Sequence, residues 1–166
     1  MQVPRRKAGQ YTFIKPDQYI TADKLAELKA DLVKLKTIVQ PQLASEVKRL
    51  AMMGDFSENA AYQIAKGRLR STNEKISQIQ KQIDCAQIIK ADKNSTTIQI
   101  GSLVTIKTNK ATKKYRILGS LETDPKAGVI SYNSPLGQAL LGKKIGELVE
   151  IKLADKNKEY KVLKIE

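Results

Sequence analysis

Two acidic residues, Asp55 and Glu58, stand three positions apart just after Gly54, where a chain reversal is expected. If a helix begins here, its first turn projects both carboxylates beyond its end. Two carboxylates presented together offer the hard oxygen ligands that Mg²⁺ accepts. The ion prefers near-ideal octahedral coordination, so this pair would hold it weakly unless another molecule supplied further ligands. The pattern therefore predicts an incomplete metal site.

The same two residues also have an ordinary structural interpretation. Asp followed three positions later by Glu at a helix start forms a capping box, in which each side chain satisfies a backbone N–H. Phe56 favours a contact with a partner, because a large aromatic side chain at an exposed turn is poor for solubility. From the residues alone both interpretations stay open, and capping and catalysis can coexist at Asp55.

The elements that would position these acids are two helices. Apolar residues step by three and four in two stretches, as in a coiled-coil seam, with the turn at 54–55 between them. The first seam is Leu25, Leu28, Leu32, Leu35 and Val39, and the second is Tyr62, Ala65, Leu69, Thr72, Ile76, Ile79, Ile83 and Ala86. We expect an antiparallel coiled-coil hairpin over 21–90, about 45 Å long, with its tip at 54–62.

Three residues mark details of these helices. Thr21 is suited to N-cap the first helix. Pro41 removes a backbone donor inside the helical pattern, so we expect a kink or a break near Val39. Gly67 in the second helix costs about 1 kcal/mol relative to Ala, and the sequence offers no reason for it.

Basic residues flank the expected tip on both arms. Lys66 and Arg70 are four positions apart and share a helix face. The candidates for binding nucleic-acid phosphates near the acids, of RNA or DNA, are Lys48, Arg49, Lys66, Arg68 and Arg70. Exposed helix charges without any ligand are the alternative interpretation.

The apolar period changes after Lys90, and residues 91–98 read as a linker. Ser134 and Pro135 are suited to start a short helix, expected over 136–141, that Gly142 closes. We expect a small α+β domain over 99–166, and residues 1–20 form a basic N-terminal extension. Runs with β character lie at 98–106, 115–118, 129–132, 148–153 and 160–165.

Composition narrows the function classes. Thirty Lys and Arg against 17 Asp and Glu give a net charge of +13, which attracts nucleic-acid phosphates or acidic protein surfaces, unless it is only a solvated Lys-rich surface. With no His and one Cys, Cys85, the chain cannot form an internal disulfide, a structural zinc site or a Cys–His nucleophile. No signal peptide and no apolar run of about 20 residues is found, so we expect a cytoplasmic protein without a membrane partner.

Two motifs resemble one family. Residues 53–62, MGDFSENAAY, resemble the hairpin tip of the GreA/GreB transcript-cleavage factors, written G-D-[LR]-x-E-N-A-x-Y. Residues 130–143, ISYNSPLGQALLGK, resemble the second family signature, I-S-x-x-S-P-x-x-x-A-L-x-G-K. Both occur in the family's order, and the similarity runs from about Thr21 to the C-terminus. Phe56 departs from the family's Leu or Arg, and Ala61 stands where an acid is common.

The resemblance implies a transcription elongation factor. Such a protein inserts its hairpin into the secondary channel of bacterial RNA polymerase and stimulates cleavage of the nascent RNA 3′ end in backtracked complexes. Asp55 and Glu58 would act there in trans by helping to hold Mg²⁺ in the polymerase active centre, with Ser57 and Asn59 in support. By this resemblance the chain is not an enzyme alone, binds no cofactor tightly alone, and is expected to be a monomer.

The resemblance also assigns a docking part. The C-terminal domain would be FKBP-like, and Asn133, Ser134 and Pro135 match a polymerase-docking loop, although GreB-type proteins tend to have Asp at the place of Asn133. A plain Ser-Pro helix start is the alternative for these residues. Two other functions stay open: a regulator that binds the channel without cleavage, and a coiled-coil adaptor that binds nucleic acid directly.

Overall fold

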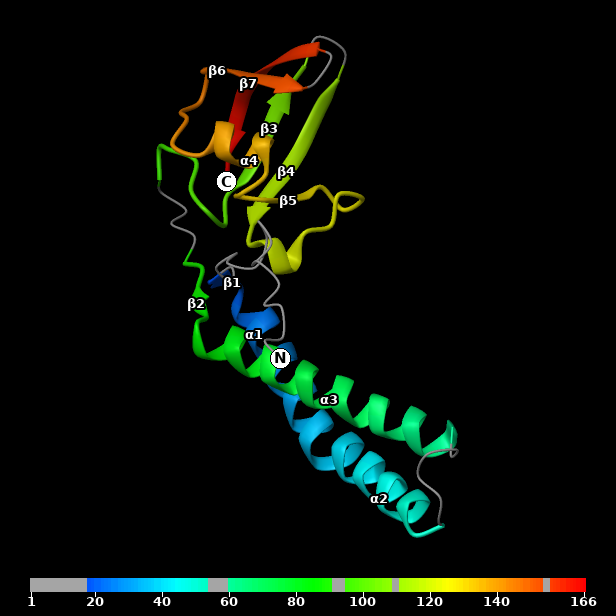
Figure 1. The fold of residues 1–166 in the computed structure, drawn as a ribbon. Helices are drawn as coiled ribbons and strands as arrows, with labels where there is room; N and C mark the ends of the chain where they lie inside the picture. The colour runs from blue at the N-terminus through cyan, green and yellow to red at the C-terminus, as the bar shows by residue number, and fades with distance from the viewer. Residues whose placement is uncertain (1–17, 54–59, 91–94, 109–110, 154–155) are drawn as a thin grey trace, which may run out of the picture.

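The computed structural model describes residues 18–53, 60–90, 95–108, 111–153 and 156–166. Figure 1 shows a helical hairpin joined to a curled sheet, and the predicted α+β fold with the hairpin first is confirmed. The main elements are β1 (Tyr19–Ile20), α1 (Ala22–Lys34), a π-helical segment (Leu35–Val39), α2 (Gln40–Ala51), α3 (Ala60–Asp84), β2 (Gln87–Ile88), β3 (Leu103–Lys107), β4 (Thr112–Leu118), a 3₁₀ turn (Ser120–Glu122), β5 (Val129–Ser131), α4 (Pro135–Leu140), β6 (Leu148–Leu153) and β7 (Lys156–Ile165).

The two arms of the hairpin run antiparallel. Lys36 Nζ donates to Gln80 Oε1 at 3.0 Å, and Gln40 Nε2 donates to Asn73 Oδ1 at 2.8 Å, so positions rise on one arm as they fall on the other. Every residue of the two predicted seams is buried or half-buried. The predicted hairpin is therefore confirmed, and the 25 residues of α3 extend over about 38 Å. Within the described ranges, no helix has the length and apolar character needed to cross a membrane.

The irregularity predicted near Pro41 takes the form of a π turn. The Gln40 N–H donates to the Leu35 carbonyl five residues earlier, and the arm continues into α2 without a break. The seam residues Leu35, Val39 and Leu43 are spaced four and then four positions apart. A regular heptad would alternate a spacing of four with a spacing of three. An insertion of this kind locally unwinds the helix, and the wider π turn absorbs it.

The end of the second arm differs from the prediction. Helix α3 ends at Asp84 instead of continuing to Lys90, because the chain beyond it forms β2 and pairs in parallel with β1. The Gln87 N–H donates to the Gln18 carbonyl at 2.6 Å. Ile20, predicted to lie in the N-terminal extension, is 1% exposed and packs with the hairpin seam. This short strand pair closes the base of the hairpin.

The C-terminal sheet has the strand order β5-β4-β3-β7-β6, with β4 and β5 parallel and the other neighbours antiparallel. Each predicted run with β character contributes a strand, and β6 has the predicted bounds. The first run begins later than predicted, at Leu103, because Gly101 adopts a positive φ of 104° and turns the chain.

One face of this sheet is covered by α4, as Figure 1 shows. Leu140 from α4 is fully buried against Val104, Ile117 and Val162 from the inner faces of three strands. The helix occupies 135–140, one residue earlier than predicted, and Gly142 follows it with φ 76°. The core of the C-terminal part is therefore aliphatic and lies between α4 and the sheet.

Candidate functional site

The candidate site is at the free end of the hairpin, which Figure 1 shows extending away from the C-terminal sheet. Helix α2 ends at Ala51 and α3 begins at Ala60. The predicted catalytic and supporting residues lie outside the described residues, as does Phe56: Asp55, Ser57, Glu58 and Asn59. The described part of the site is the pair of helix ends that carries this segment.

The two helix ends are packed together close to the tip. Leu50 on α2 is 8% exposed and Ala65 on α3 is 1% exposed, so the seam stays closed almost to its end. Tyr62 is half-buried and adds the last seam position on α3. The packed seam fixes where the tip segment leaves one helix and enters the other.

Three apolar side chains beside the tip point into solvent. Met52, Met53 and Ile64 are 79%, 68% and 57% exposed. Exposed apolar groups gathered at the end of a rod indicate a contact with a partner, and Met adapts readily to an irregular surface. These three residues were not predicted as partner contacts, unlike Phe56, although their positions outside the seam are a readable signal.

The five predicted RNA-binding residues are all exposed, but they do not form a single face. Lys66 and Arg70 lie one turn apart on α3, whereas Arg68 is about 200° from Lys66 around the helix axis. Lys48 and Arg49 lie in the last turn of α2, where positive charge suits the helix dipole. The basic residues therefore surround the end of the hairpin on several sides.

Some of these cations have weak partners within the hairpin. Arg70 Nε lies 3.0 Å from Glu74 Oε1, and Lys66 Nζ lies 5.9 Å from the centre of the Tyr62 ring. Exposed contacts of both kinds contribute on the order of 1 kcal/mol or less. A phosphate group could displace them at little cost.

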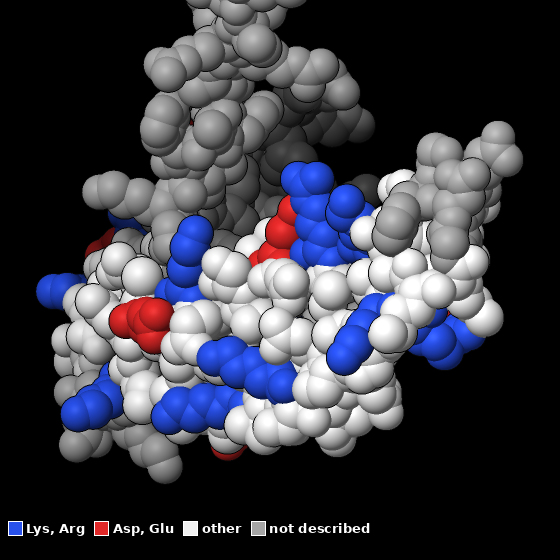
Figure 2. All heavy atoms as spheres, turned by 60° about the horizontal axis from the view of Figure 1, so that its bottom comes forward, with Lys and Arg blue, Asp and Glu red and all other residues white. Residues whose placement is uncertain are grey.

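In the described residues on either side of the tip, the charged side chains are all positive. Residues 48–53 and 60–66 contain basic residues but no Asp or Glu. Figure 2 brings the hairpin end of the molecule forward, and Lys and Arg outnumber Asp and Glu on the visible face, with uncharged residues between them. Among the described residues, no group of three or more His, Cys, Asp or Glu could hold a metal ion.

The predicted docking loop is tightly held. Ser134 Oγ accepts from the Gly137 N–H at 3.0 Å and donates to the Ser131 carbonyl at 2.6 Å. Asn133 and Pro135 on either side are exposed. The helix-start interpretation of Ser134 is confirmed by this cap, and docking by these residues stays a prediction.

A contact between the two parts of the molecule was missed. The Glu122 carboxylate accepts from the Thr21 N–H at 2.8 Å and from the Thr21 hydroxyl. The same hydroxyl accepts from the Lys24 N–H at 3.2 Å, so the predicted N-cap role of Thr21 is confirmed. The rings of Tyr19 and Tyr132 meet edge to face at 5.6 Å. Thr21 and Glu122 are 101 positions apart, and no local sequence pattern signals such a pair.

Two family descriptions match the chain. Residues 18–88 match "Transcription elongation factor, N-terminal", and residues 93–166 match "Transcription elongation factor, GreA/GreB, C-term". The first match covers the hairpin with its short strand pair, and the second covers the sheet with α4.

Individual relatives agree with these matches. The chain is 36% identical over 149 residues to transcription elongation factor GreA of Alkaliphilus oremlandii, which covers 88% of this chain and 94% of that protein. It is 38% identical over 148 residues to transcription elongation factor GreA of Mesoplasma florum, which covers 86% and 92%. Among solved structures, GreA factor homolog 1 (Gfh1) of Thermus thermophilus is similar at a TM-score of 0.42 and 18% identity, over 90% of this chain and 99% of that chain.

Proposed function

Because the chain belongs to the GreA/GreB family of transcription elongation factors, we propose that it stimulates cleavage of the nascent RNA 3′ end in backtracked complexes of bacterial RNA polymerase. The hairpin enters the secondary channel of the polymerase, and the tip segment reaches the active centre. The polymerase remains the enzyme, and this chain donates residues to it.

One observation carries the proposal: the seam of the hairpin is packed almost to its end, with Leu50 and Ala65 buried. A packed pair of helices about 38 Å long supports delivery of a short segment deep into a narrow channel. The exposed Met52, Met53 and Ile64 add apolar surface for contact with the channel wall.

The chemistry assigned to the tip rests on the donor set. Asp55 and Glu58 supply carboxylate oxygens, which fit Mg²⁺, and they would hold the ion together with ligands from the polymerase. Mg²⁺ bound there supplies charge stabilisation and an activated water for phosphodiester hydrolysis. Ser57 and Asn59 support the two acids through their hydrogen-bonding side chains. Two carboxylates alone bind the ion weakly, so the chain is inert without polymerase.

The basic flanks serve the RNA in this account. Lys66 and Arg70 lie on one flank of α3 and would contact phosphates of the extruded RNA 3′ segment. Lys48 and Arg49 on α2, with Arg68 on the other flank of α3, would add further attraction. The contacts of Lys66 with Tyr62 and of Arg70 with Glu74 are weak enough to be exchanged for phosphate contacts.

The C-terminal part keeps the hairpin in place. We assign it as an FKBP-like docking domain that contacts the polymerase through Asn133, Ser134 and Pro135. The capped, hydrogen-bonded turn at Ser134 supports this role, because a rigid turn loses little entropy on binding. The factor acts as a cytoplasmic monomer.

The test uses a backtracked elongation complex with 5′-labelled RNA and Mg²⁺. The wild-type chain should shorten the RNA, while Asp55→Ala/Glu58→Ala should bind the complex and leave the RNA intact. Neither protein should cleave free RNA. If the wild type binds the complex but the RNA is not shortened, the chain is a channel-binding regulator and the proposal fails.

A further inference from the structure

Basic side chains gather around β4 of the C-terminal sheet, far along the chain from the hairpin tip. Four of them lie on the sheet face opposite α4, and the other two, Lys113 and Lys126, lie around a hollow on the other side of β4. We call this set the β4 cationic surface, and all six side chains are exposed: Lys107, Lys113, Lys114, Arg116, Lys126 and Lys164. They come from β3, β4, β7 and the turn before β5.

The strand register fixes the spacing of the cations on the open face. Thr105 in β3 lies opposite Lys114 on one side and Lys164 on the other. Two interstrand spacings separate these lysines, so their backbones are about 10 Å apart. Arg116 follows Lys114 by two residues on the same face, and Lys107 pairs directly with Lys161. Like charges placed directly opposite destabilise a sheet, so folding does not explain the pairing of Lys107 with Lys161.

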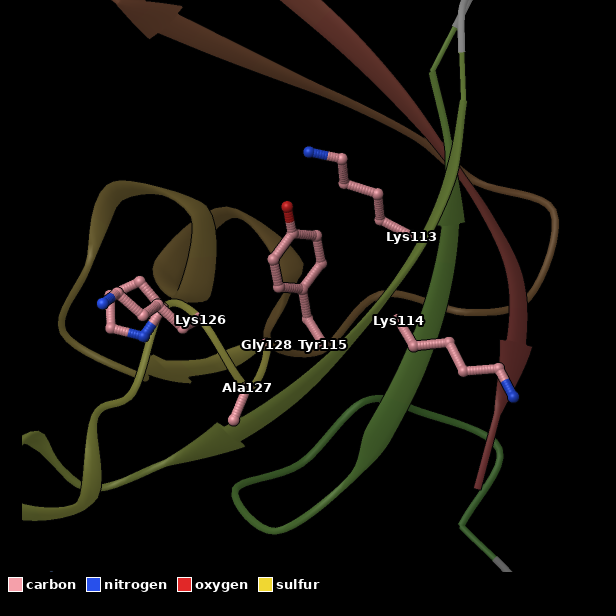
Figure 3. A pocket seen from close by; sticks show the side chains of 7 residues that line it. Lys113, Lys114, Tyr115, Lys126, Ala127 and Gly128 are labelled. Carbon is pink, nitrogen blue, oxygen red and sulfur yellow. The ribbon is translucent and has the colours of Figure 1, made fainter.

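The edge of β4 adds a hollow beside this face. The hollow measures about 310 Å³ and is lined by three lysines, Tyr115 and the turn at 125–128. Figure 3 shows Lys113 and Tyr115 on one side of β4 and Lys114 on the other, with Lys126 across the hollow. Gly128 lets the turn approach closely, because a Cβ there would lie 2.8 Å from the Lys114 carbonyl oxygen.

Few acids neutralise the β4 cationic surface. Glu166 is bonded to Lys164, and this hydrogen bond, with the charges of Lys164 and Lys114, holds the pKa of its carboxyl below the usual value. Asp124 accepts two backbone N–H groups of its own turn. Glu150 and Glu159 lie opposite each other where β6 pairs with β7, on the same open face as the cations, but β3 lies between this pair of strands and β4. Among the described residues, only Lys164 of the six has an acidic partner within ion-pair distance.

We propose that the β4 cationic surface binds the phosphate backbone of duplex DNA without sequence preference. Exposed lysines and an arginine spread over several strands suit contacts to phosphates, which position a protein without reading bases. Surfaces that bind single strands also use exposed aromatic rings for stacking. Tyr115, the aromatic residue of β4, is instead half-buried against the core. Binding to free DNA requires no polymerase, so this inference stands apart from the proposed cleavage function.

The experiment measures binding of the full chain to a short fluorescein-labelled duplex DNA by anisotropy, from about 50 to 200 mM salt. Lys114→Thr/Arg116→Thr removes two cations while keeping β propensity. It should weaken binding about tenfold and reduce the slope of log K against log salt by about 1.8. Lys29→Ala/Lys75→Ala removes the same charge from exposed hairpin positions and should change affinity less than twofold.

Lys114→Arg/Arg116→Lys keeps the charge and should bind like the wild type, which separates lost contacts from a misfolded sheet. If Lys114→Thr/Arg116→Thr and Lys29→Ala/Lys75→Ala lose DNA affinity equally, DNA is attracted by the overall charge of the protein and the proposal is overturned. Equal or tighter binding of a single-stranded RNA of the same length would overturn it as well. The proposal would also be overturned if the wild type did not bind DNA and Lys114→Thr/Arg116→Thr weakened binding to polymerase. The β4 cationic surface would then bind an acidic protein surface.

Discussion

Gly67 is exposed in the middle of α3, and the position that a Cβ would take has no neighbour within 4 Å. Neither a turn nor a close approach requires glycine there, so the sequence-based puzzle about this residue has no structural explanation. Its backbone freedom in the unfolded chain lowers the stability of the hairpin.

Gly67→Ala should therefore raise the free energy of unfolding of the hairpin by about 0.5–1 kcal/mol. The measurement is denaturant unfolding followed by helical circular dichroism. Gly137→Ala is the contrasting control, since a Cβ at Gly137 would lie 2.1 Å from the Ser131 carbonyl oxygen and should destabilise the C-terminal part. A destabilised Gly67→Ala variant would mean that this position has a contact outside the described residues.

Tyr160 is a residue whose ionisation links stability to alkaline pH. Burial raises the pKa of its phenol above the usual value, and the nearby Tyr115 raises the pKa further. A pKa that is higher in the folded state stabilises the fold fully below the unfolded value, about 10, and this contribution is lost as pH rises through the folded pKa.

The thermal midpoint of Tyr160→Phe should accordingly fall less than that of the wild type as pH rises above about 10. The control Tyr62→Phe, in the hairpin, should show the same fall of the thermal midpoint with pH as the wild type. If the thermal midpoint of Tyr160→Phe falls with pH as steeply as that of the wild type, ionisation of this phenol does not limit stability at alkaline pH.

At the scale of elements, the first arm of the hairpin depends on the π turn before Pro41. Pro41 has no N–H to offer the helix, and Pro inside a helix costs about 3 kcal/mol, part of which the π turn relieves. Pro41→Ala should raise the thermal midpoint of the hairpin, by an amount equivalent to about 1 kcal/mol or more. Gln42→Ala, at the next exposed position, should change stability by less than about 0.5 kcal/mol. A lower midpoint for Pro41→Ala would show that the π turn itself is required for packing.

The sequence predicted the elements whose signals are local. The apolar seams predicted the hairpin, because their three- and four-residue spacing is visible along the chain. Ser134 and Pro135 predicted the start of α4, because a helix cap is a short-range pattern. The pairing of β1 with β2 was not predictable, because each strand has two residues and its partner lies 68 positions away, as in the pair Tyr19 and Gln87. At the candidate site, motif and spacing predicted Asp55 and Glu58, which lie outside the described residues, while the exposure of Met52 and Met53 was readable from their positions outside the seam but was not predicted.

At the scale of the whole molecule, Glu122 joins the C-terminal part to the base of the hairpin. Its half-exposed carboxylate accepts two hydrogen bonds from Thr21, and bonds to a charged group contribute about 1.5–3 kcal/mol when well formed. Leu121 beside it packs against the cluster that contains Ile20. This contact sets how the hairpin leaves the C-terminal part.

Glu122→Ala should loosen the two parts, so that NMR relaxation gives them shorter and separate rotational correlation times. Glu147→Ala removes an acid that pairs with Lys143 within the C-terminal part and should leave the correlation times unchanged. If relaxation is unchanged in Glu122→Ala, the apolar contacts alone hold the hairpin in its orientation relative to the C-terminal part.

The central claim is that Asp55 and Glu58 act on the chemical step after the hairpin has reached the polymerase. It is tested most directly by titrating the wild type and Glu58→Gln against a backtracked complex and measuring the cleavage rate. For Glu58→Gln we expect an unchanged half-saturating concentration and a maximal rate lower by about 100-fold, equivalent to ~2.7 kcal/mol of transition-state stabilisation. An unchanged maximal rate with weaker binding would contradict it, because Glu58 would then be a docking residue rather than part of the catalytic centre.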